Sequence, residues 1–221
     1  MTSYGQFCPV AKAMEVLDER WTILIVREML LGSRHYNDLR RGVPRMSPAL
    51  LSKRLRSLER VGVVRRDVTA GRTFYTLTRA GEELRPLVES LSAWGMRWIG
   101  ELGDQDLDAH LLLWDMQRTM PLAEWPRQRT TLEMHLVDPA GVSTHWWIVA
   151  SGDRFETCDF DPGYEVTASL SGSLRTLVRV WRGEVSWDAA LASGELLAAG
   201  VARQHVPRWI GTSVFALAPA Q

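Results

Sequence analysis

Apolar side chains between residues 46 and 66 are spaced as they are along one face of a helix. Leu51, Leu55 and Leu58 recur at intervals of four and three residues, which places them in a single stripe. Ser47 precedes the stripe and is a favourable N-cap residue. The opposite face carries small and basic residues, namely Ala49, Lys53, Arg56 and Arg60. This pattern predicts a helix that buries its leucines and presents a cationic face to solvent.

A β-hairpin is predicted immediately after this helix. Residues 63–69 and 72–78 are rich in β-branched and aromatic side chains, and Ala70-Gly71 between them suits a tight turn. Helical patterns also precede the cationic helix, in two pieces within residues 9–31 and again at 34–41. Two helices joined by a short turn and followed by a hairpin indicate a winged helix-turn-helix domain that is mainly α-helical.

The helix predicted at 79–100 has an unusually narrow apolar face. Its large apolar residues alternate between three- and four-residue spacing, which is typical of helices that pack against one another. These residues are Leu84, Leu87, Leu91, Trp94 and Trp98. Such a stripe packs on its own domain or on a second copy of the chain, and we favour the second copy. A homodimer would hold two recognition helices about one DNA turn (~34 Å) apart and would require an inverted repeat.

The second half of the chain changes from helical to alternating patterns. A linker at 100–106 leads to a helix predicted at 107–120. Period-two alternation then predicts strands at 131–136, 144–150, 154–160 and 164–170. Helices follow at 171–183, with Ser171 or Ser173 as the cap, at 186–194 and at 207–217. Strands followed by helices indicate an α+β domain in which helices cover one face of a sheet.

Charge divides the chain at the same place. The net charge of zero combines 17 Lys and Arg against 11 Asp and Glu in residues 1–103 with 9 against 15 in residues 104–221. Between Arg27 and Arg79 there are 13 basic and 4 acidic residues. A cationic half beside an acidic half indicates that the first half meets a polyanion. We therefore predict a DNA-binding and dimerisation domain at 1–103 and an α+β domain at 104–221.

Cysteine content and hydropathy predict a cytoplasmic protein. Cys8 and Cys158 are far apart and lack metal-ligand spacing, as expected in a reducing compartment. The first residues lack the basic and apolar regions of a signal peptide. No apolar run approaches the ~18 residues that span a bilayer. We therefore expect no membrane partner.

The cationic helix and the hairpin together predict a site for double-stranded DNA. Arginine suits phosphate contacts, and the residues expected to make them are Arg34, Arg45, Arg65, Arg66 and Arg72. Base edges would be read from the exposed face of the helix, by Ala49, Ser52, Lys53 and Arg56, with Ser47 at its start. The competing interpretation is a solvated basic helix on an ordinary small domain. The agreement of helix, hairpin and charge disfavours it.

Residues 7–100 resemble the HxlR-type winged-helix transcription regulators. The matching segments are CPV at 8–10, RWTILIVREMLLGSRHYNDLRR at 20–41, SPALLSKRLRSLERVGVVRR at 47–66 and FYTLTRAGEEL at 74–84, with Trp94-Gly95. Two departures are visible. Asp18-Glu19-Arg20 stands where the family commonly has a Gly and a Lys before the tryptophan, and Ala70-Gly71-Arg72 replaces a common wing proline. The resemblance implies DNA binding, and the second departure affects only the contacts of the wing.

Residues 105–221 resemble the sterol-carrier-protein fold, chiefly through SGSLRTLVRVWRGEVSWDAALASGELLAAG at 171–200. Proteins of that fold enclose an apolar tunnel between sheet and helices, so the resemblance implies a pocket for a small hydrophobic ligand. The tryptophans expected to line it are Trp114, Trp146, Trp147, Trp181 and Trp209. The alternative is that these large side chains only fill a core or an interface.

Cys8 is a candidate redox-active residue. It precedes Pro9, at or next to the start of the first helix. Backbone N–H groups and the helix dipole at such a position stabilise a thiolate, which favours reaction with oxidants and electrophiles. The HxlR resemblance adds that some members sense reactive species through a cysteine in this position. The alternative is an inert thiol.

The histidines and acidic clusters give no sign of catalysis. His135 and His145 could face each other across a hairpin and bind a metal ion, but no third ligand is obvious in the sequence. We therefore predict hydrogen-bonded or surface histidines and neither a metal nor another cofactor. The sequence contains no phosphate-binding loop, nucleophile elbow or catalytic triad. The chain is predicted not to be an enzyme.

These observations favour a homodimeric winged-helix transcription regulator, expected to be a repressor, whose second domain binds a small hydrophobic effector. In one alternative, Cys8 is a thiol switch for oxidants or electrophiles and the second domain is purely structural. In another, the chain is a lipid carrier or accessory binding protein whose winged helix serves only for dimerisation. The basic patch between Arg27 and Arg79 argues against this last alternative.

Overall fold

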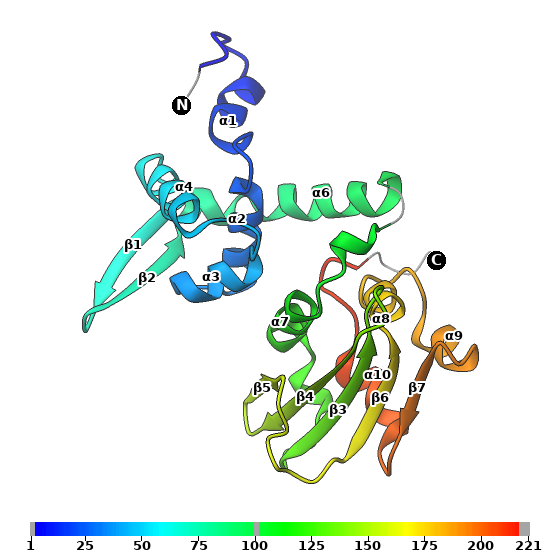
Figure 1. Ribbon diagram of the computed structural model, residues 1–221. Coiled ribbons are helices and arrows are strands. Elements are labelled where there is room, and N and C mark those ends of the chain that lie inside the picture. Colours follow the sequence, from blue (N-terminus) through cyan, green and yellow to red (C-terminus); the bar gives the residue numbers. More distant parts are fainter. Residues whose placement is uncertain (1–2, 100–101, 217–221) are drawn as a thin grey trace. The chain divides into compact units, whose positions relative to one another are not determined.

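The computed structural model of the protein describes residues 3–99 and 102–216, which belong to two compact units (Figure 1). The division falls between Ser92 and Ala93, within a continuous helix, α6 (Arg85–Trp98). The domain boundary expected from the sequence, after residue 103, stays a prediction. Among the described residues, no helix is both long enough and apolar enough to cross a membrane.

The first unit is a winged helix-turn-helix, as the sequence predicts. Its elements up to the division are α1 (Pro9–Leu17), α2 (Thr22–Leu30), α3 (Tyr36–Gly42), α4 (Pro48–Arg60), β1 (Val64–Thr69), β2 (Arg72–Leu77) and α5 (Arg79–Glu82). Strands β1 and β2 pair antiparallel to form the wing beside α4 (Figure 1). The described elements therefore have the order that a recognition helix and its wing require.

Helix α4 begins and buries its face as its sequence predicts. The Ser47 Oγ atom accepts a hydrogen bond from the backbone N–H of Leu50 at 3.3 Å, and a proline follows the cap. Leu51, Leu55 and Leu58 are each 1% exposed and pack in the core of the unit. The three leucines anchor α4 through this burial, because each one removes a large apolar side chain from water.

The wing turns through two residues in the left-handed region. Ala70 has φ +49° and Gly71 has φ +74°, and the pair Thr69–Arg72 closes the ladder. Positive φ at both central residues is what a two-residue type I′ hairpin turn requires. Glycine adopts this conformation readily, whereas Ala70 does so at an energetic cost.

The helix predicted at 79–100 is wrong in one respect, because the structure divides it into α5 and α6. Helix α5 ends at Glu82 and α6 begins at Arg85. Pro86 explains the break, since a proline inside a helix has no N–H to donate and its ring clashes with the preceding turn. In the first turn of a new helix both problems disappear. The end predicted at Gly100 lies outside the described residues.

The second unit continues with η1 (Asp104–Asp106) and α7 (Ala109–Thr119). Its remaining elements are η2 (Leu122–Glu124), β3 (Thr130–Val137), β4 (Ser143–Ser151), β5 (Arg154–Cys158), β6 (Ala168–Ser173), α8 (Leu174–Trp181), α9 (Trp187–Ala192), β7 (Leu196–Ala199), η3 (Arg203–His205) and α10 (Val206–Ile210). The strands form one five-stranded sheet in the order β5-β4-β3-β6-β7, in which only β3 and β6 pair in parallel.

Helices cover one face of this sheet, which makes the second unit α+β as predicted. Leu132, Met134 and Leu136 alternate along β3 and are fully buried. They belong to one core cluster with Met116 of α7 and Leu177 of α8. The two residues between them, Glu133 and His135, face the other side of the sheet, because successive side chains of a strand point in opposite directions.

Three details of the second unit differ from the sequence-based prediction. Strand β6 begins at Ala168, because its pairing with β3 starts there; Tyr164 lies outside the ladder and is exposed. Strand β7 was not predicted, and it follows α8 and α9, so strands do not all precede helices. The last helix ends at Ile210 because Gly211 turns the backbone to φ +68°. The predicted end at Leu217 lies outside the described residues.

Candidate nucleic-acid interface

The outward face of α4 carries the residues predicted to read bases. Ala49, Lys53 and Arg56 are exposed, and Ser52 is half-buried at the edge of the same face. Ser47 is exposed as well, but its side chain is engaged in capping the helix. An exposed lysine and arginine on a helix held by buried leucines form a surface that can enter a major groove and reach base edges.

Contacts with the preceding helix hold the start of α4 in place. The Tyr36 hydroxyl of α3 donates a hydrogen bond to the carbonyl of Pro48 at 2.8 Å. Val43 and Met46 in the intervening turn are buried. This role of Tyr36 was not predicted from the sequence. Residues 34–41 were interpreted only as a short helix, and nothing beyond the position of Tyr36, two residues after Arg34, marked it as a residue that contacts the next helix. Arg45 of the same turn is exposed.

Arg34 lies beside the base of the wing. Its carbonyl accepts a hydrogen bond from the backbone N–H of Tyr75 in β2 at 2.8 Å. The adjacent His35 ring packs on Phe74 with ring centroids 4.7 Å apart. Because the turn before α3 is joined to the wing in this way, Arg34, which is exposed, keeps a fixed position relative to β1 and β2.

The wing arginines point in different directions. Arg65 and Arg66 are successive residues of β1, so their side chains leave opposite faces of the two-stranded ribbon. The Arg65 Nε atom lies 2.8 Å from Oδ2 of Asp67, whereas Arg66 Nη2 donates to Thr73 Oγ1 at 3.4 Å. Arg72 is exposed next to the turn. Of the predicted phosphate contacts on β1, Arg65 therefore already has a carboxylate partner.

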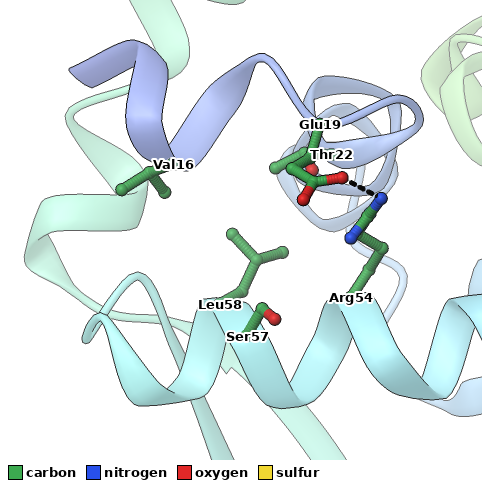
Figure 2. Close-up of a pocket in the computed structure, with 6 residues that line it drawn as sticks. All are labelled: Val16, Glu19, Thr22, Arg54, Ser57 and Leu58. Carbon is green, nitrogen blue, oxygen red and sulfur yellow. Dashed lines mark hydrogen bonds and ion pairs between the residues drawn. The ribbon is translucent and has the colours of Figure 1, made fainter. Parts of the chain in front are cut away.

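Two other arginines of the basic patch are tied to acidic residues of the first unit. Arg54 of α4 is largely buried and forms an ion pair with Glu19, and its Nε donates to the carbonyl of Arg20 at 3.3 Å. Figure 2 shows both side chains in a small pocket that Thr22 and Leu58 also line. Arg27 Nη2 lies 2.7 Å from Oε1 of the fully buried Glu28. The 13 basic residues counted between Arg27 and Arg79 therefore include two, Arg27 and Arg54, whose charges are paired with carboxylates of the first unit.

The residues predicted to form a dimer lie on an exposed stripe. Leu87, Leu91, Trp94 and Trp98 of α6 are exposed, and Trp98 is 67% exposed. Leu84 is half-buried and lies just before α6. Within α6 only Val88 is buried, and within α1 no residue is buried. Exposed large apolar side chains at this spacing are typical of a surface that another chain covers.

The five tryptophans predicted to line a ligand pocket do not all lie together. Trp146, Trp181 and Trp209 are buried in the core cluster beneath the helices, whereas Trp147 follows Trp146 on β4 and points to the opposite face. Trp114 on α7 is half-buried, with the guanidinium of Arg118 4.7 Å from its ring centroid. The structure thus brings three of the five together.

Trp125 was missed, although it belongs to the same cluster. Its ring stacks on Trp209 at a centroid distance of 4.9 Å, and its Nε1–H donates to the Trp209 carbonyl at 2.7 Å. Trp125 follows η2 in a stretch between two prolines, so it lacks the periodic pattern that marks core positions in helices and strands. The Trp181 Nε1–H donates to Oδ2 of Asp115 at 2.8 Å, which ties α8 to α7.

The two cysteines have different surroundings. Cys8 is half-buried and is the N-cap residue of α1, as the sequence predicts. Cys158 ends β5 and is half-buried as well. Burial raises the pKa of the Cys158 thiol, and the carboxylates of Glu156 and Asp159 raise it further. Cys158 is therefore held in the less reactive, protonated form.

Comparisons with known proteins match the first half of the chain. Residues 16–102 match the family model described as HxlR-like helix-turn-helix. The HTH-type transcriptional regulator YvaP of Bacillus subtilis is 40% identical over 99 residues, which are 43% of this chain and 92% of the relative. The regulator sll1512 of Synechocystis is 35% identical over 98 residues, 43% of this chain and 73% of the relative.

A solved structure, the redox regulator HypR in its reduced form, is also similar. It is 30% identical, and the match covers 41% of this chain and 92% of that chain with a TM-score of 0.39. Each of the three matches covers less than half of this chain.

Proposed function

This chain belongs to the HxlR-like helix-turn-helix family of transcription regulators, and we propose that it acts as a homodimeric repressor on an inverted-repeat operator. In this proposal, residues 1–103 bind DNA and dimerise, and residues 104–221 bind a small hydrophobic effector. A cytoplasmic location and the absence of catalysis belong to the same proposal.

The division of α4 into two faces is the observation that carries the DNA-binding proposal. The leucine face is buried, and the face with Lys53 and Arg56 is exposed. Arg54 lies between them in sequence, but its side chain is largely buried and forms an ion pair with Glu19. Lys53 and Arg56 are therefore the residues proposed to contact bases, and the exposed Arg34, Arg45, Arg66 and Arg72 are proposed to contact phosphates.

Selection from a random duplex library tests this proposal directly. The full chain should enrich a short sequence that occurs twice in inverted orientation, with centres about one helical turn apart. Fluorescence anisotropy on the selected duplex should then give a stoichiometry of two chains per duplex. Enrichment of no sequence, together with equal affinity for all duplexes, would contradict a sequence-specific regulator.

The exposed stripe on α6 supports the proposed homodimer. Leu87, Leu91, Trp94 and Trp98 present apolar surface that a folded monomer would leave in water. Burying such a stripe against its copy removes this cost. A second copy also supplies the second recognition helix that an inverted repeat requires.

The tryptophan cluster and the resemblance to the sterol-carrier-protein fold support the proposed effector site. The second unit has a five-stranded sheet with helices on one face, and the resemblance implies an apolar tunnel between a sheet and helices. Trp146, Trp181 and Trp209 lie between this sheet and these helices, where a mainly apolar ligand would be bound.

Mass spectrometry of any small molecule that co-purifies with the protein and is released by denaturation tests this part of the proposal. A protein that carries no organic molecule and binds none from a panel of fatty acids, aromatics and polyketides would contradict it.

A thiol switch at Cys8 is the second candidate function, favoured by the position of this residue at the N-cap of α1. Helix N-termini favour the reactive thiolate. Here the second unit would be purely structural. The discriminating experiment is release of the selected operator by an electrophile such as diamide. If the wild-type protein releases DNA and the Cys8→Ser variant does not, the switch replaces the effector as the means of control.

A further inference from the structure

The face of the second unit's sheet that is turned away from the helices carries two histidines and a glutamate close together. Glu133 and His135 lie two residues apart on β3, so their side chains leave the same face. His145 on β4 is the direct cross-strand partner of His135. The sequence suggested the two histidines but no third ligand; the structure brings Glu133 close to both of them.

The three side chains are near enough to share one ion. One ligand atom from each, a histidine ring nitrogen or a carboxylate oxygen, lies within 4.8 Å of the other two. The His135 and His145 ring centroids are 4.2 Å apart, and His135 Nε2 lies 3.1 Å from Oε1 of Glu133. Ligands around tetrahedral zinc lie about 3.3 Å from one another, given bond lengths of roughly 2.0–2.1 Å. Small side-chain rotations close the difference.

We propose that Glu133, His135 and His145 bind a divalent transition-metal ion of the zinc class. This inference goes beyond the proposed function, because it requires neither DNA nor an effector.

The donor set selects the class of ion. Two imidazoles and one carboxylate suit zinc, nickel, copper or iron, whereas calcium and magnesium are bound by oxygen ligands. Three protein ligands leave at least one coordination position for water or an exogenous group. The ion would also neutralise the negative charge of Glu133.

The position of the ligands in the sheet favours binding. Strand β3 is the central strand, paired with β4 on one side and β6 on the other, so the backbone beneath the ligands is fixed. Glu133 and His135 are half-buried, and His145 is exposed, which leaves the site accessible to an ion from solution. A fixed backbone lowers the entropic cost of assembling the ligands, because only the side-chain torsions remain to be ordered when the ion binds.

Isothermal titration of the full chain, stripped with a chelator, tests the proposal. The double variant Cys8→Ser/Cys158→Ser serves as the background, because it removes thiol ligands. We expect saturable binding of one zinc ion per chain at micromolar concentrations and no binding of magnesium or calcium. Cobalt(II) should give visible absorption bands with the same stoichiometry.

Substitutions in the same background locate the ion. His135→Ala and His145→Ala should each weaken binding by roughly tenfold or more, since each removes a direct ligand. Glu133→Gln should weaken it as well. His205→Ala, at an exposed histidine outside the cluster, is the matched control and should bind like the background. Absence of one-to-one binding, or equal binding by His135→Ala, His145→Ala and His205→Ala, would overturn the proposal.

Discussion

The guanidinium of Arg54 on the recognition helix forms an ion pair with the carboxylate of Glu19 in the turn before α2. This contact separates Arg54 from Arg56, which lies two residues further along α4 and is exposed. The first arginine joins α4 to the turn between α1 and α2, and the second is the one proposed to contact DNA. The same substitution at the two positions should therefore affect different measurements.

Arg54→Met should lower stability and leave DNA affinity unchanged. Methionine keeps much of the buried aliphatic stem but removes the donors to Glu19 and to the carbonyl of Arg20. We expect the lost hydrogen bonds to lower the free energy of unfolding by about 1–3 kcal/mol. The loss is not larger because Glu19 is about half exposed, so its carboxylate is solvated by water once its partner is gone. Arg56→Met should do the opposite and cost about 1–3 kcal/mol at the selected operator. Urea titration and fluorescence anisotropy measure the two quantities, and identical behaviour of the two variants would contradict the assigned faces.

Arg66→Ala should weaken specific and nonspecific DNA binding alike. A phosphate contact carries no sequence information, so its removal should flatten the slope of log affinity against log salt by about one. The neighbouring Arg65 allows the opposite test, an increase in DNA binding, because it is paired with Asp67. Asp67→Asn releases Arg65 and should strengthen nonspecific binding. An unchanged salt slope for Arg66→Ala would show that this arginine faces solvent in the complex.

Trp98→Asp should convert the proposed dimer into monomers. The substitution would place an unpaired carboxylate in the apolar interface, which is strongly unfavourable. Analytical ultracentrifugation measures the outcome, and tight operator binding should be lost with the dimer. Glu89→Ala is the matched control, since Glu89 lies on the far side of α6 from the stripe. A wild-type chain that sediments as a monomer at micromolar concentration would contradict the prediction.

Cys158 should react slowly with iodoacetamide near neutral pH. The thiolate is the attacking form, and a raised pKa means that it forms only at higher pH than in an ordinary thiol. In a Cys8→Ser background, the alkylation rate should thus keep rising with pH after that of glutathione has levelled off. Glu156→Gln removes one cause of the raised pKa and should speed the reaction near neutral pH. A rate and pH profile equal to those of glutathione would contradict this.

Sequence patterns predicted the first unit well because its chemistry is local. Ser47 and the three leucines specify α4 within a few turns of chain, and Ala70-Gly71 specifies the wing turn. The break at Pro86 was missed because the apolar stripe continues across it, and spacing alone does not register a proline. The inward direction of Arg54 was equally hidden. It depends on Glu19, which is distant in sequence and meets α4 only in the folded domain.

The second unit was harder to predict because its contacts are long-range. Strand β7 has four residues and gains its strand conformation from pairing with β6, not from its own pattern. The third ligand of the proposed metal site, Glu133, was missed although it lies two residues from His135 on β3, where both side chains leave the same face. Only the two histidines were expected to face each other, and the register of β3 and β4 pairs them directly. Trp125, outside every periodic element, gave no signal at all.

The last prediction concerns how binding of an effector to the second unit would change the DNA affinity of the first half of the chain. Arg175 of α8 donates to the carbonyl of Leu102 at 2.8 Å and pairs with Asp104 at 2.5 Å. Trp181, on the same helix, is one of the tryptophans in the proposed pocket. A ligand changes DNA affinity only if it prefers one arrangement of the chain over another. If ligand contact with Trp181 shifts α8, Arg175 transmits the shift to the residues that follow α6.

Arg175→Ala should therefore uncouple the two events while leaving each intact. Long-chain fatty acids should still change tryptophan fluorescence saturably, and the ligand-free protein should bind its operator like wild type. In the wild-type protein, a coupling free energy of about 1–3 kcal/mol would alter operator affinity by roughly 5- to 150-fold; in Arg175→Ala this change should largely disappear. Arg179→Ala, an exposed arginine on the same helix, is the matched control and should keep the coupling. Equal coupling in both variants would show that the signal does not pass through Arg175. Trp181→Ala tests ligand contact separately, and it should abolish the fluorescence response whichever route the signal takes.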